Sequence, residues 1–171
     1  AHPPANAVYA AAEGSVEPLA AADALLQAAM AAGARLLPHH EVTALQLAGG
    51  RIVGVITEDG TIAADRIVLA AGAATSRLAA SAGITLPMSA PAGLLVVTKP
   101  SPPFLNGLVM APELHVRQRA DGCLIAGSDF GGADPGTAPQ QVAETILAAL
   151  RALLIQGRDL AFDHYTVGYR P

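Results

Sequence analysis

The chain has 171 residues, of which 52% are hydrophobic and 14% are charged, and its formal net charge is −4. This composition is typical of a folded globular protein, and the scattered basic residues argue against nucleic acid as a partner. No apolar stretch reaches the roughly 18 residues that a membrane span needs, the first residues show no signal-peptide pattern, and the single cysteine, Cys123, favours a reducing, cytoplasmic compartment.

The first part of the chain predicts a helix followed by short strands. A helix is expected over 17–32, because Pro18 suits a first helical position and Gly33 can end it. Its apolar stripe is formed by Leu19, Leu25, Leu26, Ala29 and Met30. A strand is expected at 34–37. Alternating apolar residues and the turns Gly49-Gly50 and Asp59-Gly60 then predict a meander with strands at 42–47, 51–57 and 61–63.

Residues 66–71 form an apolar run without alternation, which is typical of a strand buried on both faces of a parallel sheet. We expect the meander to pair with this strand in a layered α/β arrangement. A short helix is expected at 75–82 and should stop at Gly83.

Prolines divide the second part into short pieces, which predict a mainly antiparallel sheet. Its strands are expected at 93–98, 108–110, 114–119, 123–128 and 160–168. An amphipathic helix is predicted at 140–154, with an apolar face of Val142, Ile146, Leu147, Leu150, Leu153 and Leu154. A loop near an active-site mouth is expected at 129–132.

Several segments could carry chemistry. The run Leu69-Ala70-Ala71-Gly72-Ala73 would let a ligand approach the backbone at a strand end, although an ordinary loop after a core strand fits it equally. His115 and Arg117 alternate on a predicted strand and share a face, which either lines a pocket or is solvated. A metal at His39-His40-Glu41 is disfavoured, because neighbouring side chains on a strand point to opposite faces. Cys123 is expected to be a small buried hydrophobe, not a nucleophile.

The motifs together form an ordered series from Gly14-Ser15-Val16-Glu17-Pro18 through Leu69-Ala70-Ala71-Gly72-Ala73 and Asp121-Gly122-Cys123-Leu124 to Val167-Gly168-Tyr169-Arg170-Pro171. This series resembles the D-amino-acid-oxidase-like family of FAD-dependent oxidoreductases, which includes glycine, sarcosine and proline-type oxidases and dehydrogenases.

The resemblance implies FAD as the cofactor and a set of site residues. Val42 would contact the adenine end of FAD through its backbone, and Ala70, Ala71 and Gly72 would lie against the cofactor. Arg170 would bind the substrate carboxylate, unless it pairs with an acidic neighbour such as Asp159 or Asp163.

The resemblance also implies a fold of α/β plus α+β class. A partial FAD-binding domain is expected at 1–86, a substrate-binding lobe at 87–168, and a return to the first domain at 169–171. The activity implied is the oxidation of a C–N bond in a small amine or amino acid by hydride transfer to flavin.

Other interpretations stay open. No G-x-G-x-x-G phosphate loop occurs in the sequence, so the chain could be a non-catalytic fragment that binds FAD poorly on its own. A related flavoprotein acting on a larger amine, such as a modified nucleoside, is a further alternative. No acid–base residue is assigned, and the oligomeric state is left open.

Overall fold

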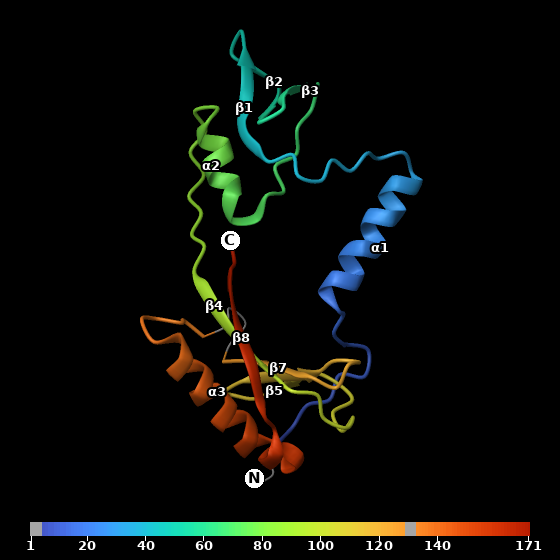
Figure 1. The fold of residues 1–171 in the computed structure, drawn as a ribbon, viewed down its shortest axis with the longest axis vertical. Coiled ribbons are helices and arrows are strands. Elements are labelled where there is room, and N and C mark those ends of the chain that lie inside the picture. The colour runs from blue at the N-terminus through green and yellow to red at the C-terminus, as the bar shows by residue number, and fades with distance from the viewer. Residues whose placement is uncertain (1–4, 129–132) are drawn as a thin grey trace. The chain divides into compact units, whose positions relative to one another are not determined.

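The structure is a computed structural model that describes residues 5–128 and 133–171 (Figure 1). The loop expected at 129–132 lies outside the described residues. The chain divides into two compact units. One unit contains residues up to Ala21 and Pro91–Tyr169, and the other contains Ala22–Ala90 with Arg170 and Pro171. We refer to them as unit 1 and unit 2.

Unit 1 is built on a five-stranded antiparallel sheet with the order β5-β6-β7-β4-β8. Its strands are β4 (Ala92–Thr98), β5 (Val109–Met110), β6 (His115–Gln118), β7 (Leu124–Gly127) and β8 (Phe162–Tyr169). All five strands expected from the alternation are present within two residues at each end. The prediction of a mainly antiparallel sheet is therefore confirmed.

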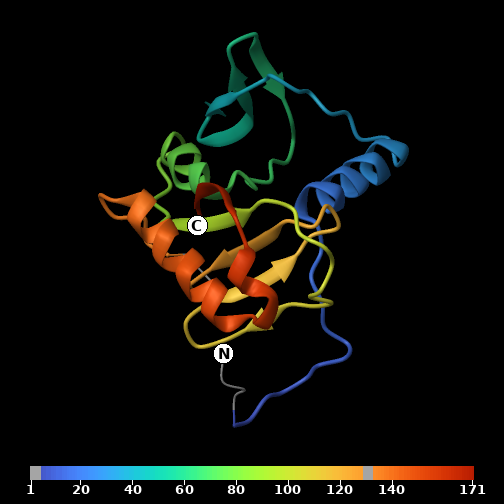
Figure 2. The same ribbon diagram turned by 60° about the horizontal axis from the view of Figure 1, so that its bottom comes forward.

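Helix α3 (Pro139–Leu153) covers one face of this sheet, as Figures 1 and 2 show. Alternate residues of β4, β6 and β7 point to the helix, which gives the unit one apolar core. That core consists of Leu94, Val96, Leu114, Val116, Leu124, Ala126, Ala143, Ile146, Leu147, Leu150 and Leu160. The predicted helix face is confirmed, because its residues are either in this core or packed against it. The short 3₁₀ segment η2 (Ile155–Asp159) then leads into β8.

Unit 2 contains the predicted meander as a separate three-stranded sheet in the order β1-β2-β3. The strands are β1 (Val42–Ala48), β2 (Arg51–Thr57) and β3 (Gly60–Ala63). Both turn glycine sites have positive φ, for example +57° at Gly49 and +120° at Gly60, which explains why these turns need glycine. A 3₁₀ turn, η1 (Gly72–Ala74), runs directly into helix α2 (Thr75–Ala80).

The hydroxyl of Ser81 connects α2 to the meander. It donates to the carbonyl of Leu78 at 2.6 Å and accepts the backbone N–H of Leu45 at 2.9 Å. Leu45, Leu78 and Ala79 are the buried apolar residues at this contact. Unit 2 thus has a small core of its own between one short helix and one sheet face.

Two predicted strands are absent. Residues 66–71 form no strand, and Val68 is 88% exposed, so the expected buried parallel strand and its pairing with the meander were wrong. A strand forms only by hydrogen bonding to a neighbour, and among the described residues no strand pairs with this run. Residues 34–37 form no strand for the same reason.

Helix α1 (Pro18–Ala31) forms within one residue of its predicted bounds, but its side chains are not buried. Leu19 is 85% and Leu25 is 71% exposed. Alanines occupy much of every face, so the sequence favours the helix strongly but sets the apolar face apart only weakly. Among the described residues, the predicted apolar stripe is therefore not a buried face.

Candidate functional site

The face of the unit 1 sheet opposite α3 carries His115 and Arg117, the two residues of β6 that were predicted to share a face. Leu95, His115, Arg117 and Ile125 alternate with the core residues of their strands and therefore point away from the helix. They line one hollow of about 450 Å³, together with Ser15, Glu17, Pro18, Leu19, Leu108 and Arg119. The prediction that His115 and Arg117 share a face is confirmed. Whether they bind a substrate remains a prediction.

Strand register explains how the hollow is shaped. His115 lies opposite Gly127, and Arg117 lies opposite Ile125. A methyl group at Gly127 would come within 2.7 Å of the Leu95 Cδ2 atom and 3.0 Å of the His115 Cε1 atom. The imidazole and the leucine side chain therefore occupy space that only a glycine leaves open.

Charged side chains form a network at the edge of this hollow. The Arg117 guanidinium hydrogen-bonds the Glu17 carboxylate, and these side chains are only 15% and 37% exposed. Arg119 places its Nε atom 3.5 Å from Glu17 Oε2 and its Nη2 atom 3.1 Å from Asp121 Oδ2. Its Nε is buried and makes no hydrogen bond within the described part of the chain.

Glu17 was missed as a site residue. It is 100 positions away from Arg117 in the sequence, and nothing local to either residue predicts the pairing. The one available signal was its place in the Gly14–Pro18 motif that resembles the family.

Gln118 fixes the loop that flanks the hollow. Its side-chain oxygen accepts the N–H groups of Phe104 and Leu105 at 2.9 and 3.1 Å. Its side-chain nitrogen donates to the carbonyls of Pro102 and Gly122, each at 3.1 Å. One amide thus ties the proline-rich segment to the β6–β7 hairpin and restrains the backbone next to Arg117.

In unit 2 the segment expected to lie against FAD is open. Ala70, Ala71 and Gly72 are all exposed. Gly72 has φ +53°, and no other group lies within 4 Å of the position a Cβ would take. A flat ligand could therefore approach this backbone closely, and the segment fits a cofactor edge. Val42, the first residue of β1, is half-buried and pairs with Thr57; its predicted adenine contact remains a prediction.

Arg170 follows β8, whose last residue, Tyr169, pairs with Ala92. The Arg170 side chain is exposed and makes no hydrogen bond or ion pair with another residue that the structure describes. Asp163 is one alternative partner, but its Oδ2 atom lies 2.7 Å from the Nδ1 atom of His164. The arrangement leaves the Arg170 guanidinium available for a ligand.

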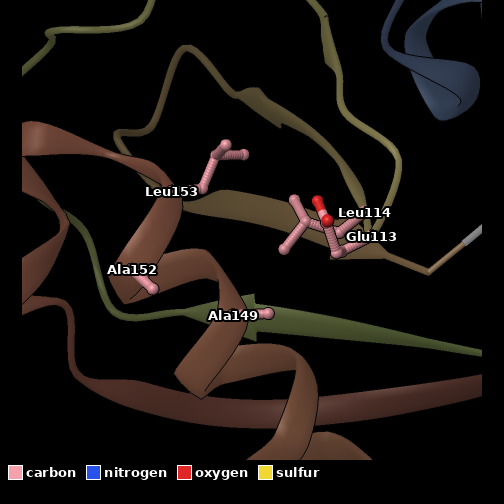
Figure 3. Close-up of a pocket in the computed structure, with 5 residues that line it drawn as sticks. All are labelled: Glu113, Leu114, Ala149, Ala152 and Leu153. Carbon is pink, nitrogen blue, oxygen red and sulfur yellow. The ribbon is translucent and has the colours of Figure 1, made fainter. Parts of the chain in front are cut away.

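A second hollow in unit 1 has different chemistry. Figure 3 shows Glu113 and Leu114 facing Ala149, Ala152 and Leu153 of α3. Its lining is apolar apart from one carboxylate, and it contributes no cation for a carboxylate ligand. We therefore place the candidate site on the opposite face of the sheet.

Two other candidates, a metal site at residues 39–41 and a nucleophile at Cys123, have less support. Residues 38 and 39 form a turn, and residues 40 and 41 belong to no strand, so the argument from strand alternation at His39-His40-Glu41 was wrong. No group of three metal-ligating side chains occurs within 5–128 and 133–171. Cys123 is half-buried, and burial together with the Asp121 carboxylate raises the pKa of its thiol, which disfavours a nucleophilic thiolate.

The fold is shared with the solved structures of an L-proline dehydrogenase and a glycine oxidase. L-proline dehydrogenase from P. horikoshii superposes with a TM-score of 0.72 at 24% identity, over 89% of this chain and 43% of that one. Glycine oxidase from Geobacillus kaustophilus superposes with a TM-score of 0.68 at 25% identity, over 88% and 41%. The first of these similarities concerns the fold alone.

Sequence comparison gives the family. The FAD dependent oxidoreductase (DAO) family model matches residues 2–171, and the chain belongs to this family. Glycine oxidase of Pseudomonas putida is 31% identical over 137 residues, which are 80% of this chain and 38% of that enzyme. The hydrogen cyanide synthase subunit HcnC of Pseudomonas aeruginosa is 32% identical over 81% of this chain and 34% of that protein. The chain thus spans less than half the length of these relatives.

The family resemblance and the fold class expected from the sequence are confirmed. None of the helices in the described parts is long and apolar enough to cross a membrane.

Proposed function

We propose that the protein containing this chain oxidises the C–N bond of a small amine or amino acid with FAD. The observation that carries the proposal is the exposed guanidinium of Arg170, which has no partner among the described residues. The similarity to glycine oxidase supports the substrate class.

The roles of the residues follow from their chemistry. When bound, FAD supplies the hydride acceptor. The exposed backbone of Ala70–Gly72 and the start of β1 at Val42 would hold the cofactor. Arg170 would bind the substrate carboxylate through two parallel hydrogen bonds, which fixes the orientation of the α-carbon. His115 and Arg117 would line the substrate pocket on the open face of the sheet.

Substitution of Arg170 tests this assignment. Arg170→Lys keeps the charge but loses the planar pair of donors, so one charge-assisted hydrogen bond is lost. Such a bond contributes about 1.5–3 kcal/mol, so we expect a loss of roughly ten- to a hundredfold in kcat/KM for amino acids. Arg170→Ala should lose more, because the carboxylate would then enter the site without a partner. Flavin content should stay close to wild type in both variants.

The control is an amine substrate that has no carboxylate. Its kcat/KM should change little in either variant, because Arg170 has nothing to bind in it. Equal losses for carboxylated and uncarboxylated amines would show that Arg170 supports the structure, and the proposed substrate class would lose its main support.

A further inference from the structure

The charges around the hollow in unit 1 are paired within the protein. Arg117 lines the hollow, and Glu17 already occupies its guanidinium. Arg119 lies beside Glu17 and pairs with Asp121. Two positive and two negative side chains therefore meet at this edge, and the Arg117 charge is matched before any ligand arrives.

We propose that Glu17 determines substrate specificity by neutralising Arg117, so that the site selects amines with one carboxylate over amines with two. The inference rests on the proposed function, in which the substrate is a small amine or amino acid and His115 and Arg117 line its pocket. It changes the role given to Arg117: the side chain still lines the hollow, but Glu17 neutralises its charge, so that it does not bind a substrate carboxylate.

Geometry and burial support this assignment. The Arg117 side chain is 15% exposed, and the Glu17 side chain is 37% exposed, so their interaction is less screened than a surface pair would be. A second substrate carboxylate would have to displace Glu17 from Arg117 and would meet the negative charge of Glu17 at short range. A small apolar substituent meets no such competition.

The rest of the lining fits an uncharged substituent. Leu95, Leu108 and Ile125 give the hollow an apolar wall beside the charged edge. Burying a methyl or methylene group against these side chains is favourable, whereas burying a carboxylate there without a cation is not. The neutralisation of Arg117 by Glu17 and the apolar wall thus both disfavour a substrate with a second carboxylate.

The test uses two inert ligands, acetate and succinate, on the FAD-loaded, full-length protein. Each is titrated while the visible flavin spectrum is followed, and the ratio of the two dissociation constants is compared between variants. In Glu17→Gln the Arg117 guanidinium loses its partner, so succinate should gain about tenfold or more relative to acetate. In Glu17→Gln/Arg117→Gln, which has the same net charge as wild type, the ratio should return to within about threefold of the wild-type value.

A third variant keeps the proposal testable if Glu17→Gln fails to retain FAD. Arg117→Gln leaves the Glu17 carboxylate facing the hollow, so succinate should weaken relative to acetate by about threefold or more. Changes of opposite sign in the two single variants are specific to charge, because a general loss of structure would weaken both ligands alike. An unchanged ratio in Glu17→Gln, or a gain for succinate that persists in the double variant, would overturn the inference.

The two proposals fail differently. If acetate does not bind wild type, or binds Arg170→Ala as well as wild type, the proposed function is wrong. If acetate binding depends on Arg170 but the succinate ratio does not respond to Glu17, only the assignment of Glu17 is wrong.

Discussion

The buried hydroxyl of Thr98 completes the sheet of unit 1 where its backbone pairing stops. Between β4 and β7 the paired residues end at Val97 and Ile125, and β8 has an irregularity opposite Val97 and Thr98. The Thr98 Oγ1 atom accepts the backbone N–H of Leu124 at 3.0 Å and donates to the carbonyl of Lys99 at 3.0 Å. Thr98 is 0% exposed, so water cannot replace these bonds.

We expect Thr98→Val to destabilise the protein by about 1–3 kcal/mol. Valine keeps the shape of threonine, so little packing is lost, but the N–H of Leu124 would be left buried without an acceptor. At a urea m-value of about 2 kcal/mol/M, the unfolding midpoint should fall by roughly 0.5–1.5 M with an unchanged slope. Thr98→Ser should recover part of this loss, because it restores the hydroxyl and removes only a methyl group.

Thr43→Val is the matched control. Its hydroxyl also donates to a backbone carbonyl, that of Ile56 at 3.2 Å, but the site is exposed and water can take its place. The free energy of unfolding of this variant should differ from that of wild type by less than about 0.5 kcal/mol. If urea unfolding shows Thr98→Val to be as stable as wild type, the hydroxyl is not needed at the end of this ladder and the reasoning is refuted.

Two further predictions concern the meander and the cysteine. Gly54→Ala should destabilise unit 2 by about 1–3 kcal/mol, because the new methyl would lie 2.5 Å from the Ile62 carbonyl oxygen. Gly107→Ala is the control and should be neutral, because the position of its new methyl has open space around it. Equal unfolding temperatures of the two variants would contradict this prediction. Burial, and then Asp121, raise the pKa of the Cys123 thiol, so its rate of alkylation by iodoacetamide at pH 7 should be lower than that of a small free thiol. The rate should increase with pH into the alkaline range and should be higher in Asp121→Asn. A rate at pH 7 equal to that of the free thiol would show that the cysteine is not protected.

Much of the fold could be predicted from the sequence because it depends on local periodicity. Alternation of apolar residues placed each strand of the unit 1 sheet, and the 3.6-residue period placed α3 together with the face it buries. Glycines in the turns marked the meander, because only they adopt positive φ without strain. The ordered motifs also pointed to the correct family, since they occur in the same order along the chains of its members.

Burial and pairing over long separations could not be predicted. The run 66–71 has the composition of a buried strand, yet none of its residues is buried, because a strand needs a partner and none of the described strands provides one. Helix α1 has a helical pattern without a buried face. In both cases local composition indicates what a segment can become, and the neighbours decide whether it does.

The candidate site divides in the same way. The sequence by itself determined that His115 and Arg117 share a face, because side chains two residues apart on a strand point in one direction. Only the tertiary structure brought Glu17 to Arg117 across 100 residues and so matched the charge of that arginine. The energy of an ion pair depends on distance and burial in space, and neither quantity is encoded in the spacing of the two residues along the chain.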